Sequence, residues 1–277
     1  MFYADQHMHS SVSFDSHTTR IDMAEAAVHA GLSALCFTDH YDVVDENGHF
    51  HPDYDWHPAR RQHAEARAAC GEQIHLGYGL ELGNAPEDFA AAEGVLQEPG
   101  LDLVIASIHN SSAALDHIDY YCANYNTPEL CYQHLEDYFQ SLLRLAQWGQ
   151  FDVLGHLPYP LRYMRDRDHQ PVSLDRYQDI IREILCCTVQ AGRGIEVNTC
   201  LYHPGSAADY TEILTAFHEL GGEVVTVGAD AHNPGNVGHA IADGYQLLRA
   251  CGIRYISHFV GRTPQFISLS KEVPFHA

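Results

Sequence analysis

Residues 33–40 read S-A-L-C-F-T-D-H, a short apolar run that ends in an acidic residue and a histidine. A run of this length bounded by polar residues is typical of a buried strand. Similar runs recur along the chain, and each is followed by a polar segment and then by a helical pattern. The candidate strands are residues 2–7, 33–39, 75–82, 102–108, 151–156, 194–199 and 223–229, with a further short apolar run at 254–260. This alternation predicts repeated βα units on a parallel sheet.

The segment 128–148 shows the helical pattern clearly. Thr127 and Pro128 suit the N-cap and the first turn, and apolar residues then recur at helical spacing. Residues 173–191 behave in the same way, with Ser173 as the expected cap. We therefore expect helices between the strands.

The chain has no composition break, linker or internal repeat that would divide it. With 277 residues, of which 45% are apolar, it has the material for one α/β barrel. We predict a single domain, residues 1–277, of about seven βα units. Two connections, residues 41–58 and 110–127, are long and polar, and between them rich in Tyr, His and Trp. They suit either lids over a pocket or ordinary surface loops.

The charge balance is strongly acidic, with 15 Lys and Arg residues against 37 Asp and Glu residues and a net charge of −22. Such a surface repels nucleic acid and anionic lipid, so we expect neither as a partner. A solvated acidic surface accounts for most of this excess, and bound cations would offset part of it. Lys271 is the only lysine, so a cationic contact to a substrate must come from arginine.

The eight cysteines are scattered, with no C-x-x-C pair and no secretory leader before them. They are interpreted as reduced thiols. No stretch approaches the roughly 18 apolar residues that a membrane span needs. We predict a cytoplasmic protein and make no prediction for its oligomeric state.

The 21 histidines are the unusual feature of the composition. A single histidine is more often a surface or core residue than a ligand. Here, however, histidines and acids stand at the C-terminal ends of most predicted strands, where parallel barrels carry their active sites. They are His7, His9, Asp39, His40, Glu81, His109, His156, Asp230 and His232. Because imidazole and carboxylate suit zinc, iron and manganese, the pattern predicts a metal centre.

The histidines and acids lie in short motifs along the chain: D-Q-H-M-H-S at 5–10, S-F-D-S at 13–16, T-D-H at 38–40, G-L-E at 79–81, S-I-H at 107–109, L-G-H at 154–156 and G-A-D-A-H at 228–232. These motifs and their order resemble the polymerase and histidinol phosphatase (PHP) family, and within it the histidinol-phosphatase branch. They span nearly the whole chain. The resemblance implies a distorted (β/α)7 barrel that binds about three divalent ions, as zinc, manganese or iron.

The resemblance also implies which residues hold the ions. One ion would take His7, His9, Glu81 and Asp230. A second would share Glu81 and add His109 and His156, and a third would take Asp15, His40 and His232. Some relatives have histidine at the position of Asp15, and His17 is the alternative ligand. Asp39 is expected to fix the ring of a ligand histidine.

The activity implied by the resemblance is hydrolysis of a small phosphate monoester by metal-activated hydroxide. The leading substrate is histidinol phosphate, which would place the enzyme in histidine biosynthesis. The chain has neither a G-x-S-x-G elbow nor a Walker-type loop, so no Ser or Cys nucleophile is expected. Asp230 or His232 would protonate the leaving alkoxide.

Arg162 is expected to bind the phosphate, because the histidinol-phosphatase branch has an arginine in a similar context after the strand of His156. Arg165 and Arg167 follow it, and a solvated basic loop is the alternative interpretation of the three. The branch tends to carry another arginine soon after E-x-N-T, but here the chain reads E-V-N-T-C-L-Y-H-P.

Other functions stay open beside this one. The protein could act on another small phosphate ester or nucleotide, or as a phosphodiesterase, although its net charge of −22 disfavours long polyanions. A non-catalytic metal-binding module is the third possibility, and the complete ligand set argues against it.

Overall fold

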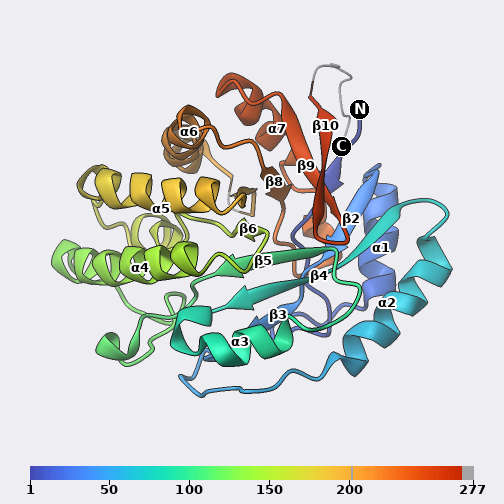
Figure 1. The fold of residues 1–277 in the computed structure, drawn as a ribbon, viewed down its shortest axis with the longest axis horizontal. Helices are drawn as coiled ribbons and strands as arrows, with labels where there is room; N and C mark the ends of the chain where they lie inside the picture. The colour runs from blue at the N-terminus through green and yellow to red at the C-terminus, as the bar shows by residue number, and fades with distance from the viewer. Residues whose placement is uncertain (201, 270–277) are drawn as a thin grey trace.

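A computed structural model describes residues 1–200 and 202–269, so Lys271 lies outside the described residues. The strands of its main sheet are parallel and follow one another in chain order (Figure 1). They are β1 (Ala4–Asp5), β2 (Ala34–Phe37), β4 (His75–Gly83), β5 (Leu103–Ser107), β6 (Val153–Leu154), β7 (Gly194–Asn198) and β8 (Val225–Gly228). The predicted order of strands is confirmed, although β1 is shorter than the expected 2–7.

The two edges of this sheet meet, so that it is nearly closed into a barrel. The amide of Gln6 donates to Val227 O at 3.1 Å, and that of Asp230 donates to His7 O at 2.9 Å. One further strand, β3 (His40–Asp42), pairs with the second half of β4, while β2 pairs with the first half. The predicted distorted barrel is therefore confirmed, and β3 is a source of its irregularity.

Helices surround the sheet (Figure 1). They are α1 (Arg20–His29), α2 (Trp56–Cys70), α3 (Phe89–Val95), α4 (Pro128–Trp148), α5 (Gln178–Gln190), α6 (Pro204–Glu219) and α7 (Ile241–Ala250). Helix α4 begins as predicted, since the Thr127 side chain accepts a hydrogen bond from the amide of Leu130. The prediction of Ser173 as a helix cap is wrong. Its hydroxyl donates to Asp175 at 2.9 Å, and a 3-10 turn, η4 (Asp175–Tyr177), precedes α5.

The apolar run at 254–260 forms no further βα unit. It becomes β9 (Tyr255–Val260), which pairs antiparallel with β10 (Thr263–Ser268). Gln6 holds this hairpin to the barrel, since its Nε2 donates to Ser257 O at 2.5 Å. Phe259 of β9 packs against Leu103 and other buried barrel residues. The hairpin therefore covers the end of the barrel where β5 begins.

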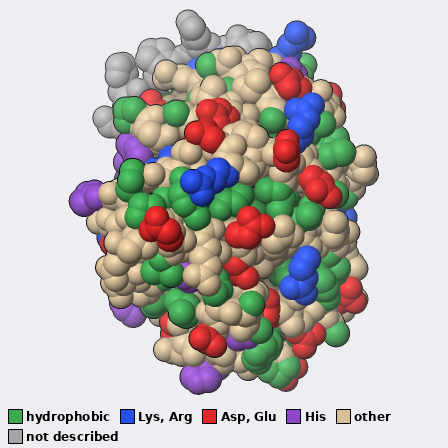
Figure 2. Space-filling model, turned by 90° about the vertical axis from the view of Figure 1, so that its left-hand side faces the viewer, with side chains coloured by type: hydrophobic (Ala, Val, Ile, Leu, Met, Phe, Trp, Pro, Cys, Tyr) green, Lys and Arg blue, Asp and Glu red, His purple; other side chains and the backbone are tan. Residues whose placement is uncertain are grey.

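Acidic side chains are scattered over the face of the molecule in Figure 2, with a few basic side chains among them. This distribution agrees with a solvated acidic surface. Within the described part of the chain, no helix is both long and apolar enough to cross a bilayer.

Candidate metal centre

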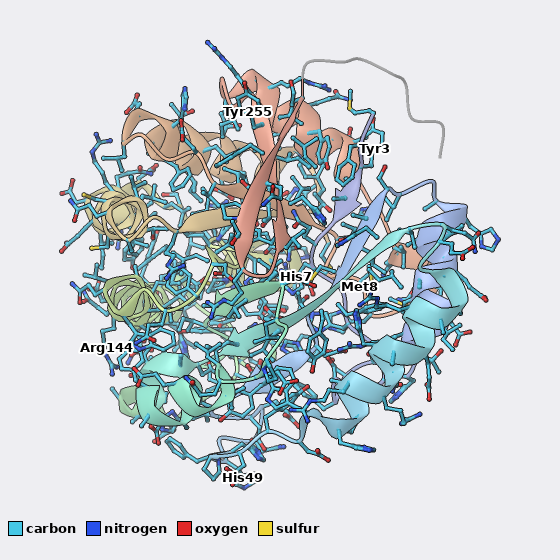
Figure 3. The ribbon with its side chains drawn as sticks, turned by 45° about the vertical axis from the view of Figure 1, so that its right-hand side comes forward. Tyr3, His7, Met8, His49, Arg144 and Tyr255 are labelled. Atoms are coloured by element: carbon cyan, nitrogen blue, oxygen red, sulfur yellow. The ribbon has the colours of Figure 1, made fainter. Side chains whose placement is uncertain are left out.

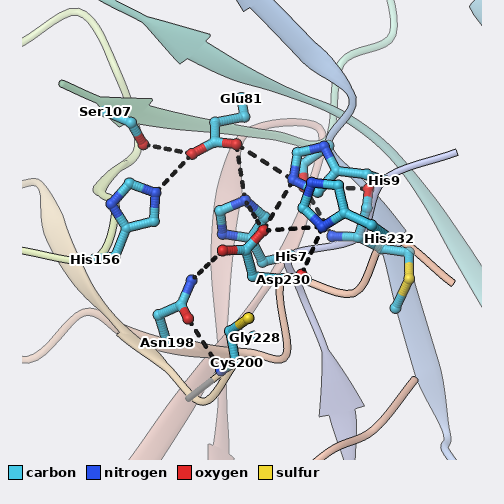
Figure 4. Close-up of polar contacts among 12 residues, drawn as sticks. His7, His9, Glu81, Ser107, His156, Asn198, Cys200, Gly228, Asp230 and His232 are labelled. Atoms are coloured by element: carbon cyan, nitrogen blue, oxygen red, sulfur yellow. Dashed lines mark hydrogen bonds and ion pairs between the residues drawn. The ribbon is translucent and has the colours of Figure 1, made fainter. Parts of the chain in front are cut away.

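The C-terminal ends of the strands bring histidines and acids from distant parts of the chain into one cluster (Figure 4). His7 lies in the interior of the molecule, as Figure 3 shows, and its side chain is fully buried. His7 and His9 follow β1, and Glu81 lies on β4. The other members each follow a strand or lie at its start: His40 on β3, His109 after β5, His156 after β6, and Asp230 and His232 after β8.

The carboxylate of Glu81 occupies the middle of this cluster. Its Oε2 lies 3.0 Å from His7 Nε2, 3.3 Å from His9 Nε2 and 3.3 Å from His40 Nδ1. Its Oε1 lies 3.0 Å from His156 Nε2 and 3.2 Å from His109 Nε2. The Ser107 hydroxyl donates to Oε1 at 2.7 Å. One carboxylate therefore reaches two sets of rings, as a bridging ligand must.

The expected ligand sets come together in space. In each of three groups, one ligand atom per residue lies within 4.8 Å of the others. The groups are His7, His9, Glu81 and Asp230; Glu81, His109 and His156; and His9, Asp15, His40 and His232. The third group thus contains His9 in addition to the expected residues. Asp42 forms a further group with His40 and His109.

Asp15 reaches the third group directly. Its Oδ2 lies 2.8 Å from His232 Nε2 and 3.5 Å from His40 Nε2. His17 is exposed, and within residues 1–200 and 202–269 it belongs to none of these groups. The geometry therefore favours Asp15 over His17 as a ligand.

The hydrogen bonding of the buried ring nitrogens indicates whether these residues suit a metal. His7 Nε2 and His9 Nε2 are buried and find no hydrogen-bond acceptor among the described residues, although carboxylate oxygens lie close by. A buried polar atom left in this way costs free energy. Nitrogens and carboxylate oxygens that face each other at about 3 Å without hydrogen-bond geometry have the arrangement expected of ligands around a shared cation. The residues present therefore fit a divalent metal centre.

The electrostatics of the cluster favour ionised carboxylates. Burial opposes ionisation of Glu81, but the charges of His7, His40 and His109 outweigh it and lower the pKa of Glu81 well below its usual value. The pKa of Asp230 is also well below its usual value, because His7 and His9 outweigh its burial. Both acids thus offer charged oxygens at neutral pH.

Outer side chains orient the rings, and the sequence analysis did not predict them. Glu196 Oε1 lies 2.7 Å from His7 Nδ1, and Asp42 Oδ1 lies 2.8 Å from His109 Nδ1. The Ser13 hydroxyl lies 3.1 Å from His9 Nδ1. Each partner engages Nδ1, so that Nε2 is left to face the centre. Glu196 and Asn198 are two residues apart on β7, so their side chains point to the same face of the sheet. This spacing is the signal in the sequence that could have indicated Glu196.

The expectation that Asp39 contacts a histidine ring is wrong. Its Oδ2 pairs with Arg20 Nη2 at 2.6 Å, and its Oδ1 accepts from the Ser13 hydroxyl at 3.0 Å. Ser13 is the residue that reaches His9. Arg20 is buried on α1, and a buried guanidinium needs an acid beside it. Asp39 therefore forms an ion pair with Arg20 and does not contact a histidine ring.

Arg162 lies at the edge of the cluster. Its Nη1 is 3.7 Å from Asp230 Oδ2, and its Nη2 donates to Asn198 Oδ1 at 3.3 Å. The two arginines after it are used elsewhere. Arg165 pairs with Asp209 at 2.7 Å, and Arg167 pairs with Asp168 at 2.8 Å. Of the three arginines, Arg162 is therefore the one placed to meet a ligand of this centre.

His203 lies shortly after the E-V-N-T segment, where no arginine is found, and its side chain contacts Asp166. Its Nε2 lies 3.0 Å from Asp166, and its Nδ1 accepts the amide hydrogen of Gly205 at the start of α6. The segment after E-V-N-T contains no arginine and therefore provides no second guanidinium beside Arg162.

A parallel barrel with a histidine and carboxylate cluster at its strand ends defines a metal-dependent hydrolase. Residues 5–200 match the PHP domain, and the chain belongs to this family. It is 27% identical over 254 residues to a probable histidinol-phosphatase of Thermotoga maritima, covering 91% of this chain and 94% of that protein. It is 30% identical over 265 residues to a probable histidinol-phosphatase of Deinococcus radiodurans, covering 91% and 95%.

The fold is also similar to that of a solved structure. The histidinol phosphate phosphatase of Lactococcus lactis, complexed with zinc, L-histidinol and phosphate, superposes with a TM-score of 0.80. The alignment covers 95% of this chain and 98% of that chain at 23% identity. This comparison supports the barrel architecture described above.

The central position of Glu81 predicts the effect of removing its charge. Glu81→Gln should lose bound metal and nearly all hydrolysis while remaining folded, since the amide keeps the shape of the side chain. Elemental analysis and circular dichroism measure the two properties. The exposed Glu65 supplies the control Glu65→Gln, which should keep its metal. A Glu81→Gln protein with full metal content would show that this carboxylate bridges nothing.

The position of Asp15 predicts a selective loss. Asp15→Ala should lower the metal content by about one ion per chain, because the groups that share Glu81 do not contain Asp15. His17→Ala should retain its metal. If His17→Ala loses the ion instead, the ligand is His17, and if neither variant loses metal, the centre holds fewer ions than the family resemblance implies.

Proposed function

We propose that this chain is a metal-dependent phosphatase that hydrolyses histidinol phosphate to histidinol and inorganic phosphate. One observation carries the proposal: a cavity that combines the histidine and carboxylate cluster with a single arginine. The relatives named histidinol-phosphatases support it, because they align over nearly the whole of this chain and of their own length. Another small phosphate monoester is the alternative substrate.

The cavity has a volume of about 410 Å³, which suits a small molecule. Members of the cluster line it, among them Asp15, His40, Glu81, His109, His156, Asp230 and His232. Tyr159, Arg162 and Tyr163 line it as well, and the guanidinium of Arg162 lies over the ring of Tyr159 at 4.9 Å. A phosphate group bound in this cavity would therefore lie beside both the cluster residues and Arg162.

We propose that the three residue groups that contain the expected ligands each hold one divalent ion, about three in all. When bound, such ions activate water and neutralise phosphoryl oxygens. The chain's own contribution is to fix the ligands, through Glu196, Asp42 and Ser13, and to bind the phosphate through Arg162. A planar guanidinium offers two parallel donors to phosphate oxygens.

A proton must also reach the leaving alkoxide, and His232 and Asp230 are the candidate donors. The His232 side chain is 30% exposed and that of Asp230 is 8% exposed. Burial opposes protonation of His232, but its contact with Asp15 raises the pKa of the ring. The greater exposure of His232 favours it as the donor, since its side chain is more accessible than that of Asp230.

We further propose that residues 1–277 form one hydrolase domain and that the protein is cytoplasmic. A single hydrophobic cluster that extends from Tyr3 to Leu269 supports the first proposal. Cysteines that are all free, both in the core and at the surface, support the second.

Release of phosphate from several substrates tests the proposed function. The metal-reconstituted protein should release inorganic phosphate from L-histidinol phosphate faster than from other monoesters, and should not cleave a phosphodiester. A preference for the diester would indicate the phosphodiesterase alternative. A protein that binds metal but releases phosphate from none of these compounds would be a non-catalytic module.

The position of Arg162 predicts a defect in substrate binding. Arg162→Ala should raise KM for the phosphomonoester by about tenfold or more, since a charge-assisted hydrogen bond contributes roughly 1.5–3 kcal/mol. Its metal content should stay unchanged. Arg182→Ala removes an exposed arginine on α5 and serves as the control. An unchanged KM in Arg162→Ala would assign phosphate binding to the metal ligand groups alone.

A further inference from the structure

The loop at residues 110–127 supplies part of the cavity wall, through Tyr121 and Cys122 among others. Arg162 lines the same cavity from a different segment, a single π-helical turn, η3 (Arg162–Arg167). Turns of this kind are rare and are often found at functional sites. The contacts between the loop and η3 therefore determine how this part of the wall is placed relative to the arginine.

Arg167, the last residue of η3, connects the two segments. Its Nη1 donates to Tyr121 O, and its Nη2 donates to Ala123 O. Its Nε also donates to Asp168 Oδ1 at 2.9 Å, and its Nη2 donates to Asp168 Oδ2 at 2.8 Å. The same carboxylate accepts the amide hydrogen of Tyr125 at 2.9 Å. Arg167 and Asp168 together thus hold three alternate residues of the loop.

The geometry of this connection matters more than the stability that it adds. The side chain of Arg167 is 35% exposed and that of Asp168 is 21% exposed, and ion pairs with such exposure contribute little to the free energy of folding. A planar guanidinium that serves two carbonyls and a carboxylate, however, fixes their relative orientation. The Arg167 guanidinium also lowers the pKa of Asp168 to about 2, so the pair stays ionised at neutral pH.

A row of tyrosine rings connects Arg167 to Arg162. The Arg167 guanidinium lies over the ring of Tyr163, 5.3 Å from its centroid, and Tyr121 of the loop packs edge-on against the same ring. The Tyr163 hydroxyl donates to the Tyr159 hydroxyl at 3.1 Å, and these two rings have centroids 5.2 Å apart. The Arg162 guanidinium lies over the Tyr159 ring at 4.9 Å. Because a guanidinium is attracted to an aromatic face, the position of Tyr159 helps to determine where Arg162 lies.

Arg162 depends on this support, because its own polar contacts are long. Its Nη2 donates to Asn198 Oδ1 at 3.3 Å, and its Nη1 lies 3.7 Å from Asp230 Oδ2. Charge-assisted hydrogen bonds that hold a guanidinium firmly are usually about 2.7–2.9 Å long. These direct contacts therefore fix the orientation of the Arg162 guanidinium only weakly, and the packing against Tyr159 adds the missing constraint.

We propose that Arg167 is a positioning residue for the reaction: it joins the loop to η3 and, through the row of tyrosines, orients the Arg162 guanidinium toward the phosphate. The inference rests on the proposed phosphatase function. In the described part of the chain, Arg167 is not among the residues that line the cavity, so it acts from behind the wall. Removal of its side chain should therefore weaken substrate binding through Arg162 and leave the metal ligands in place.

A double-mutant cycle on the zinc-loaded protein tests this proposal. Arg167→Ala should raise KM for L-histidinol phosphate about threefold or more, with kcat and metal content nearly unchanged. In the Arg162→Ala background the same change should raise KM no further, because the residue that Arg167 positions is gone. Equal rises in KM in the two backgrounds would show that the two arginines act independently, and this result overturns the proposal. An unchanged KM in Arg167→Ala alone overturns it as well.

Further variants separate the effect of position from that of charge. Arg167→Lys keeps the positive charge but lacks the planar fork, so its KM should stay raised. A wild-type KM in Arg167→Lys would assign the effect to charge alone and overturn the proposal. Arg176→Ala is the matched control, since Arg176 is exposed and lies over the ring of Tyr132 at 3.9 Å, outside the cavity, and its KM should not change. If Arg167→Ala fails to fold, the same cycle with Asp168→Asn, which removes the charged partner of Arg167, decides.

Calorimetric binding of inorganic phosphate to the zinc-loaded protein separates this proposal from the proposed function. A wild-type protein that hydrolyses no monoester, but binds phosphate more tightly than Arg167→Ala does, refutes the phosphatase and supports the positioning role. A wild-type protein that hydrolyses L-histidinol phosphate, with KM and phosphate affinity equal in Arg167→Ala, supports the phosphatase and overturns the positioning role. A wild-type protein that neither hydrolyses monoesters nor binds phosphate overturns both.

Discussion

The burial of one carboxylate among histidine rings is the constraint on which the site depends. Glu81 is 1% exposed, and an isolated charge at such depth would cost several kcal/mol. The surrounding rings and the Ser107 hydroxyl compensate this cost, and they come from the ends of several strands. The barrel must therefore close with these ends at one rim. The long strand β4, paired with β2, β3 and β5, holds Glu81 at that rim.

The β9–β10 hairpin covers the opposite end of the barrel. The β9–β10 hairpin attaches through Gln6, and Phe259 fills space against Leu103. The cluster side remains open through the cavity, where histidines, acids and one arginine gather. Polar groups that would be costly in the core are thus placed where ions and substrate can satisfy them.

Further buried polar pairs stabilise the geometry of the candidate metal centre. The pair of Arg20 and Asp39 links α1 to the end of β2 and, through Ser13, to His9. Such a buried pair is costly to disrupt, because removal of one partner leaves the other charge unpaired. Helix packing and the orientation of the His9 ring are therefore coupled, and a change at Arg20 would be transmitted to the candidate metal centre.

The sequence alone determined the repeated strand and helix units and the histidines and acids that follow the strands, because apolar runs ending in histidine or acid are local features of the chain. From these local patterns followed the alternation of strand and helix and the start of α4 at Thr127. The convergence of Glu81 with the histidines followed from their positions after the strands. Only the tertiary structure decided the partners of these residues. Asp42 reaches His109 because β3 pairs with β4 beside β5, and Asp39 turns to Arg20 because α1 packs there. Such contacts depend on strand register and helix position, which residues distant in sequence determine together, so no local pattern encodes them.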